Sequence, residues 1–342
     1  MDIETKYKGK NVLIVGGAGF IGSNLAHKLV SLGADVTIAD IFHPSYGGNM
    51  FNLNEIIDCV KLSYTDLGDE YGMRRLVEDK SYIFDLAAQV SYTDSMNIPY
   101  VDLDINCRCH LQLLEICREV NPGVSILFTS SRMVYGKPFV IPVSEEHPTN
   151  PLSLYATHKL TGEKYFYLYK HHYGINSKIV RIANPYGPRN QMENSKYGIL
   201  NWFIRLAMED KEIKIFGEGS QLRDYIYIDD IVNGILSVAA LVNPEQIIYN
   251  LGTGKGTSFS KMVDDILFVV GKGRKIYIPW PNNYEKNETG DFISDIDRLT
   301  EILGSDYKFI GLEEGIEKTL EFYNENLCAY IKSEPAGELV MK

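Results

Sequence analysis

The stretch NVLIVGGAGFIGSNLAHKL, residues 11–29, decides the fold of this 342-residue chain. It begins with a short apolar run, which is typical of a buried strand, and ends in an amphipathic helical pattern. Between the two, Gly16, Gly19 and Gly22 follow one another at intervals of three residues. Glycine suits a tight turn, because it lacks a Cβ and lets the backbone approach a neighbouring group closely. The stretch therefore predicts a strand, a tight turn and a helix.

The same alternation of apolar runs and helical patterns continues through the first half of the chain. Further strands are expected at 35–40, 81–88, 124–131, 177–184 and 247–254, and helices at 23–33 and 109–120. Strands that are apolar on both faces and alternate with helices favour a parallel sheet covered by helices on both sides. We therefore expect an α/β fold, a Rossmann-type doubly wound parallel sheet with a smaller C-terminal mixed α/β domain.

The glycine-rich turn also predicts a ligand. A helix N-terminus offers unpaired N–H groups and a positive dipole, which bind a pyrophosphate when glycines let it come close. Asp40 ends the second expected strand. A carboxylate there can bond a ribose hydroxyl and would repel a 2′-phosphate, which favours NAD over NADP. We expect residues 1–184 and about 225–255 to form the NAD-binding domain, and about 185–224 and 256–342 the substrate domain.

Composition argues against several other classes of protein. The net charge of −11 disfavours general binding to nucleic acid or to a membrane surface. No apolar run approaches the ~18 residues of a membrane-spanning helix, and residues 1–10 lack the apolar core of a signal peptide. The five cysteines lack the spacing of a metal site, so we expect buried thiols and no metal. A cytoplasmic location is the default expectation.

Tyr155 and Lys159 lie four residues apart in a helix expected over 153–173, and so share one face. A phenol with a pKa of about 10 is a poor base at neutral pH. A neighbouring ammonium group and a positive nicotinamide ring would stabilise the phenolate and lower that pKa. An exposed aromatic–lysine pair would look the same in the sequence, so the pair alone leaves catalysis open.

Taken in order along the chain, the motifs resemble those of the extended short-chain dehydrogenase/reductase family, and more narrowly its nucleotide-sugar epimerases and dehydratases. The resemblance covers nearly the whole chain. Besides the glycine turn and the YxxxK pair, the similar segments are LAAQ (86–89), NPYGPRN (184–190), FGEGSQLRDYIYIDD (216–230) and YNLGTG (249–254).

The resemblance implies a site, residue by residue. The catalytic residues would be Ser131, Tyr155 and Lys159, with Tyr155 as the general base. The cofactor NAD would contact Gly16, Gly19, Phe20, Ile21, Gly22, Asp40, Asp66, Leu67, Ala87, Ala88, Gln89, Asn106, Tyr155 and Lys159. A nucleotide-diphosphate sugar would contact Ser91, Ser131, Arg132, Tyr155, Asn184 and Arg223.

Three further expectations follow from the resemblance. Asn184 and Arg223 would grip the diphosphate of the sugar nucleotide, because a guanidinium binds phosphate oxygens bidentately. Arg189 is either another clamp or a solvated loop arginine. Members of the family pair through two helices each, so we expect a homodimer through residues 101–120 and 153–173.

The sequence departs from the family pattern at two places that bear on the reaction. Arg132 and Met133 stand where 4,6-dehydratases have an acidic pair. Met133 has no exchangeable proton, and arginine cannot act as a base at neutral pH. Glu288 stands where many relatives have an arginine that contacts the diphosphate.

We therefore expect an NAD-dependent 4-epimerase of a nucleotide-linked hexose, working through a transient 4-keto sugar. A 2-epimerase or a 4-keto reductase shares the same motifs and stays open. A dehydratase or decarboxylase with relocated acids is less favoured. A dinucleotide sensor without activity is also less favoured, because it has no reason to keep Ser131, Tyr155 and Lys159.

Overall fold

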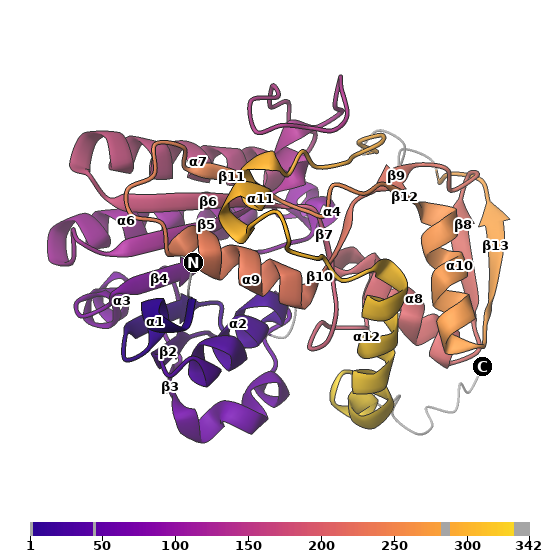
Figure 1. Cartoon of the computed structure of the whole chain (residues 1–342), viewed down its shortest axis with the longest axis horizontal. Helices are drawn as coiled ribbons and strands as arrows, with labels where there is room; N and C mark the ends of the chain where they lie inside the picture. Colours follow the sequence, from indigo (N-terminus) through magenta and orange to yellow (C-terminus); the bar gives the residue numbers. More distant parts are fainter. Residues whose placement is uncertain (1–2, 44–45, 282–287, 332–342) are drawn as a thin grey trace, which may run out of the picture.

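A seven-stranded parallel sheet forms the centre of the molecule (Figure 1). The computed structural model describes residues 3–43, 46–281 and 288–331, so the end of the predicted substrate domain, 332–342, lies outside the described residues. The strand order is β11-β6-β5-β4-β1-β2-β3. The strands are β1 Asn11–Val15, β2 Asp35–Ala39, β3 Val60–Ser63, β4 Tyr82–Asp85, β5 Ser125–Ser131, β6 Asn176–Ile182 and β11 Ile248–Leu251. The predicted Rossmann-type sheet is confirmed.

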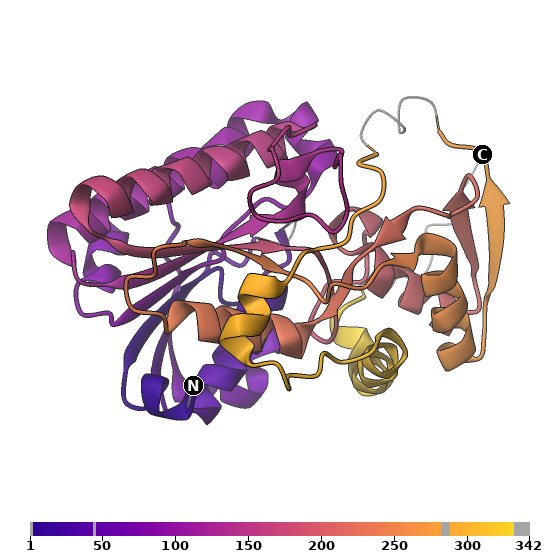
Figure 2. The same cartoon turned by 45° about the horizontal axis from the view of Figure 1, so that its top comes forward.

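Both faces of the sheet are buried, as the apolar strands predict. In β1, Val12 and Ile14 pack into one hydrophobic cluster, and Leu13 and Val15 into a second on the opposite face. Figure 2 shows the sheet between two helical layers. The helices of the first cluster include α2 Phe20–Ser31 and α9 Ile228–Ala239, which pack against the sheet; those of the second are α3 Glu70–Val77, α6 Cys109–Val120 and α7 Leu154–Tyr173.

The strand order reverses beside β1, which pairs with β2 on one side and with β4 on the other. The connections that leave β1 and β4 therefore separate at the carboxyl ends of these strands. In open parallel sheets, ligands bind in the crevice at such a switch point. The fold thus fixes the place of the site before any side chain is considered.

Smaller elements gather at the end of the molecule away from α6 and α7 (Figures 1 and 2). Three further strand pairs occur here: β7 with β10, β9 with β12, and β8 with β13. The bounds are β7 Asn184–Tyr186, α8 Ile199–Met208, β8 Glu212–Phe216, β9 Leu222–Arg223, β10 Tyr225–Tyr227, β12 Thr257–Ser258, α10 Phe259–Val270, β13 Arg274–Ile278 and α12 Leu312–Asn326. A further helix, α11 Asp297–Leu303, packs against α9 and β11 instead. The division of the chain into two domains stays a prediction.

The helix predicted over 101–120 consists of three consecutive pieces. These are α5 Pro99–Leu103, a π-helical turn at Asp104–Arg108, and α6. A short helix, α4 Tyr92–Asn97, precedes them. Within the part of the chain that the structure covers, no helix is both long and apolar enough to cross a membrane.

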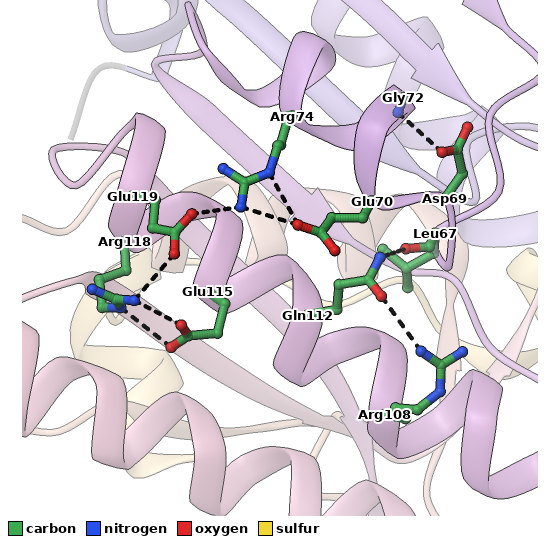
Figure 3. A network of polar contacts seen from close by, with 10 residues as sticks. All are labelled: Leu67, Asp69, Glu70, Gly72, Arg74, Arg108, Gln112, Glu115, Arg118 and Glu119. Atoms are coloured by element: carbon green, nitrogen blue, oxygen red, sulfur yellow. Dashed lines mark hydrogen bonds and ion pairs between the residues drawn. The ribbon is translucent and has the colours of Figure 1, made fainter.

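Charged side chains join α3 to α6 on the surface (Figure 3). Arg74 of α3 donates hydrogen bonds to Glu70, one turn earlier, and to Glu119 of α6. In the same network, the side chain of Gln112 donates to the backbone oxygen of Leu67 at 3.3 Å. This contact anchors the loop after β3, which carries two of the predicted cofactor residues.

Candidate active site

A cavity of about 540 Å³ lies at the carboxyl ends of the central strands. Its wall is built from the turn after β1, the ends of β2, β4 and β5, the first turns of α2 and α7, and residues of α8, β9 and β10. Most of the residues that the sequence singled out meet on this wall. They are Gly16, Gly19, Phe20, Ile21, Gly22, Asp40, Asp66, Leu67, Ala87, Ala88, Ser131, Arg132, Tyr155, Lys159, Asn184 and Arg223.

The glycine turn meets the requirements of a pyrophosphate site. Gly16 has φ +80°, and a Cβ placed on it would lie 2.9 Å from the backbone nitrogen of Ala87. A Cβ on Gly22 would lie 2.2 Å from the carbonyl oxygen of Gly16, so both glycines are needed for packing. Gly19 is the N-cap of α2, and no side chain caps the helix. The first N–H groups of α2 are therefore left for an anion.

Asp40 lies at the end of β2 with its carboxylate held in place. One oxygen accepts a hydrogen bond from the backbone nitrogen of Ala18 at 2.9 Å, and the other accepts from that of Phe42 at 2.8 Å. Burial raises the pKa of Asp40, and the two backbone donors oppose that shift. Each oxygen retains a free lone pair for a ribose hydroxyl. Together with the glycine turn, this donor and acceptor set fits a dinucleotide.

The loop after β3 forms the far end of this half of the cavity. Asp66 accepts a hydrogen bond from the backbone nitrogen of Gly68 at 2.6 Å. Leu67 is buried, and Gln112 of α6 holds its carbonyl (Figure 3). Both predicted residues are thus fixed at the cavity wall.

The three predicted catalytic side chains converge where β5 ends. Ser131 is the last residue of β5, and its Oγ accepts a hydrogen bond from the backbone nitrogen of Met133 at 3.2 Å. Ser153 caps α7 by accepting from the nitrogen of Ala156, so Tyr155 lies in the first turn of that helix and Lys159 one turn later. The phenol of Tyr155 is buried and hydrogen-bonded to Ser131.

Burial dominates the electrostatics of this group. It raises the pKa of Tyr155 to about 12, against the lowering effect of the bond to Ser131. It lowers the pKa of Lys159 to about 8, against the raising effect of three nearby carboxylates. The joint effect of the Lys159 ammonium group and the nicotinamide ring on the pKa of Tyr155 stays a prediction. In the structure, Lys159 by itself does not shift that pKa. The reason is geometric, because the Lys159 ammonium donates to the Thr129 carbonyl at 3.1 Å and lies 4.7 Å from the centre of the Phe128 ring.

Three predicted contact residues do not line the cavity. Gln89 is fully buried and donates to the Ser91 carbonyl at 2.9 Å, while Asn106 donates to the Gln89 carbonyl at 2.8 Å. Ser91 caps α4 by accepting from the nitrogen of Asp94 at 3.1 Å. Most polar atoms of these side chains bond to one another or to neighbouring backbone and side chains, while Oδ1 of Asn106 has no partner among the described residues. The three residues support the loop behind Ala87 instead of reaching a ligand.

Arg189 is likewise held by the protein. It donates to Asn24 at 3.1 Å and to Glu55 at 3.2 Å, and its guanidinium stacks against the ring of Phe322. Of the two alternatives left open by the sequence, a further diphosphate clamp and a solvated loop arginine, neither describes this side chain. It connects α2 to the C-terminal helix α12.

At the other end of the cavity, Arg223 forms an ion pair with Glu288. Arg223 also donates to the Gly290 carbonyl at 2.7 Å. The neighbouring Arg132 donates to Thr289 Oγ1 at 3.0 Å. Asn184 lines the same end, and its side-chain oxygen has no partner among the described residues. This end therefore carries two arginines and one carboxylate.

Comparison with known proteins agrees with this geometry. The model of the NAD dependent epimerase/dehydratase family matches residues 12–252. The chain belongs to this family. UDP-glucose 4-epimerase of Mycolicibacterium smegmatis is 32% identical over 315 residues, which make up 91% of this chain and 97% of that protein. UDP-glucuronic acid decarboxylase 1 of Xenopus tropicalis is 29% identical and spans 93% of this chain and 73% of its own length.

A solved structure shows the same overall fold. The UDP-glucose 4-epimerase of Thermotoga maritima, determined with UDP-glucose, is 30% identical to this chain, with a TM-score of 0.83. The alignment covers 93% of this chain and 99% of that one. Membership of the family establishes NAD as the cofactor and nucleotide-sugar chemistry as the type of reaction. It does not fix the reaction itself, since relatives of similar identity include an epimerase and a decarboxylase.

Sequence reasoning missed several residues of the cavity wall. Phe216 and Trp280 bring two aromatic rings together, with centroids 5.5 Å apart, and Tyr92 and Tyr225 also line the wall. Phe216 opens a segment that resembles a family motif, which was a usable signal. Trp280 lies in a stretch without any motif, so nothing in the sequence alone could place it.

A second missed feature lies behind the catalytic pair. His158, to which the sequence assigned no function, contacts the fully buried carboxylate of Asp102 at 2.6 Å. Asp102 also accepts a hydrogen bond from Asn106 at 2.9 Å. This cluster fastens α5 to α7 directly beside Tyr155 and Lys159.

Proposed function

We propose that this protein is an NAD-dependent 4-epimerase of a nucleotide-diphosphate hexose. The supporting observation is the set of carboxylates on the cavity wall, which among the described residues consists of Asp40, Asp66 and Glu288. The first two lie at the cofactor end, and Glu288 is paired with Arg223. Arg132 and Met133, which follow the catalytic serine, supply neither the acid nor the base that elimination of water from the sugar requires.

Epimerisation needs only what the cavity offers. NAD, when bound, accepts a hydride from the sugar and returns it. Ser131 orients the reacting hydroxyl, and Tyr155 removes its proton and later gives it back. Lys159, which donates to the Thr129 carbonyl in the structure, would act together with the nicotinamide ring to favour the phenolate form of Tyr155. Between the two proton transfers, the keto sugar rotates within the cavity, so that the hydride returns to the opposite face of the sugar.

The proposed contacts follow the geometry. The glycine turn, Asp40, Asp66, Leu67, Ala87, Ala88, Tyr155 and Lys159 bind NAD, and Asn184 and Arg223 bind the diphosphate. Gln89, Ser91 and Asn106 support the cofactor loop from behind. Residues 1–184 and about 225–255 form the NAD-binding domain, and the remaining residues form the domain for the sugar nucleotide.

The reaction is tested by incubating the purified protein with UDP-, dTDP-, CDP- and GDP-hexoses and following the sugar by NMR. We expect a C4 epimer without net reduction of NAD. A 4-keto-6-deoxy product or a pentose would contradict the proposal. Denaturation of the purified protein should also release NAD, since the epimerase regenerates its cofactor in every turnover.

We further propose that two chains pair through α5, α6 and α7. Large apolar side chains remain exposed on these helices, which in a monomer costs hydrophobic free energy. They are Tyr100, Val101 and Leu103 on α5 and Tyr167 and Leu168 on α7. The cytoplasmic location expected from the sequence stays a prediction.

A further inference from the structure

Arg132 is an unusual residue at its position. It directly follows the catalytic Ser131, lies on the cavity wall and is only 8% exposed. Among the described residues, its one hydrogen-bond acceptor is Thr289 Oγ1, at 3.0 Å. The ring of Phe292 lies against its guanidinium, at 5.3 Å from the ring centre. A guanidinium has five N–H donors, so most of its donors are left for a partner in the cavity.

The charges around Arg132 do not balance. Arg223 lies close enough to act on it, and among the described residues the one carboxylate that acts on both is Glu288, which is already paired with Arg223. Burial and the neighbouring positive charge together lower the pKa of Arg132 to about 9. A buried cation with a neutral hydroxyl as its partner is costly, unless a ligand brings a negative charge.

Tyr225 adds a second donor at the same place. Its ring is buried on the cavity wall, and its hydroxyl has no partner among the described residues. Both Arg132 and Arg223 act on this hydroxyl electrostatically. A buried hydroxyl without a partner loses free energy that a ligand oxygen would restore.

The position of Arg132 indicates which part of the substrate it faces. In the proposed function, the reacting hydroxyl is held by Ser131 and Tyr155, and the diphosphate is held by Arg223. Arg132 directly follows Ser131 and lies close enough to Arg223 for their charges to interact, so a sugar bound between the two points would meet its guanidinium. We propose that Arg132 and Tyr225 bind a carboxylate carried by the sugar, and hence that the substrate is a nucleotide-linked uronic acid. This inference rests on the proposed 4-epimerase and narrows its substrate class.

The test compares two ligands that differ only in the group at C6, UDP-glucuronate and UDP-glucose, with UDP as a third. Isothermal titration of the NAD-loaded protein measures the three dissociation constants. We expect UDP-glucuronate to bind at least about tenfold more tightly than UDP-glucose, which corresponds to one charged hydrogen bond. Equal affinity for the two sugars, or no binding of either, overturns the proposal.

Three variants show which residues cause the preference for UDP-glucuronate. Arg132→Met removes the charge but keeps an apolar side chain in a buried place, and should abolish the preference while changing the affinity for UDP-glucose less than about threefold. Arg132→Lys keeps a positive charge and should therefore retain part of the preference for UDP-glucuronate. Tyr225→Phe should weaken UDP-glucuronate alone. If Arg132→Met weakens all three ligands equally, the guanidinium binds the diphosphate and the proposal is wrong.

Binding and turnover separate this inference from the proposed reaction. A C4 epimer formed from UDP-glucose without any preference for the uronic acid supports the 4-epimerase and overturns the carboxylate site. In the opposite case, UDP-glucuronate binds more tightly, Arg132→Met abolishes that preference, and NMR shows no C4 epimer. That result supports the carboxylate site and overturns the proposed reaction.

Discussion

At the scale of single residues, the site depends on groups whose protonation burial has shifted. The pKa of Tyr155 is raised and that of Lys159 is lowered, both chiefly because the side chains are removed from water. The base is therefore inactive until positive charge comes close to it. The predicted source of that charge is the nicotinamide ring of NAD, the cofactor of the family, acting together with Lys159.

Tyr155→Phe should lower kcat by about a hundredfold to ten-thousandfold, because it removes the group that takes the proton. The NAD content of the purified variant should be unchanged, since the ring and the helix that carries it remain. Turnover by NMR and the NAD released on denaturation check both parts. Tyr71→Phe, at an exposed position on α3, is the control. A Tyr155→Phe variant with near-normal kcat would falsify the base assignment.

Lys159 predicts a pH dependence of stability in cofactor-free protein. Its pKa is about 8 in the folded chain and about 10.4 when unfolded. Between these values the unfolded chain binds more protons, so stability due to Lys159 rises with pH across the window, by up to about 3 kcal/mol.

Lys159→Met removes this dependence. The free energy of unfolding of the variant relative to the unaltered chain should therefore fall as pH increases from about 8 to about 10.4. Urea unfolding at a series of pH values measures it. Lys164→Met, at an exposed position of the same helix, is the control. A relative stability that stays constant with pH would count against the burial of a charged Lys159.

At the scale of elements, the strand–turn–helix unit at residues 11–31 unites fold and cofactor binding. The glycines in it serve different purposes. Gly16 and Gly22 let backbone segments touch, whereas a Cβ on Gly19 would meet no protein atom closer than 3.4 Å. Gly19 is therefore free of internal packing demands and faces the cavity.

Gly22→Ala should destabilise the protein by about 3 kcal/mol or abolish folding, because its Cβ would overlap backbone that cannot move aside. Gly19→Ala should leave the melting temperature within a few degrees and lower the NAD content several-fold. Thermal unfolding and NAD release, measured on both variants, distinguish the packing role of Gly22 from the cofactor-binding role of Gly19. The outcome against this view is a Gly19→Ala variant that retains its full complement of NAD.

Buried elements were easier to predict from the sequence than elements at the edge of the sheet. Strands with long apolar runs were found from the sequence, but β3 was missed because VKLS is short, mixed in character and at the edge of the sheet. The residues of the cavity wall were found where a motif carries them. Gln89 belongs to the LAAQ motif too, yet it bonds to Ser91 and Asn106 and does not line the cavity. Sequence resemblance places residues near a ligand but cannot show which polar atoms are already occupied.

At the scale of the whole molecule, the two long helices α6 and α7 cover one face of the sheet, on the side away from the small strand pairs (Figures 1 and 2). They lie over the cluster around Leu113 and Phe166. Their other side carries exposed apolar side chains, of which Tyr100 on the adjoining α5 is 80% exposed. The same helices thus hold the sheet together and present the surface proposed for pairing.

Tyr100→Glu and Leu168→Glu should each weaken dimerisation by about tenfold or more, because a carboxylate would be buried at the contact. Analytical ultracentrifugation over a range of concentrations measures the effect. Phe268→Glu places the same charge on the exposed face of α10, away from these helices, and should change nothing. A protein that is monomeric before any substitution would contradict the pairing.

The ion pair between Arg223 and Glu288 bears on product inhibition. A diphosphate must compete with a carboxylate of the protein itself for the same guanidinium, so part of the binding free energy of any nucleotide goes into separating that pair. Free nucleotides should then be weak inhibitors. In the proposed epimerase, substrate and product share one diphosphate, so the pair weakens both alike and does not shift their equilibrium. The expected gain is kinetic, because a product that is held less tightly leaves the site faster.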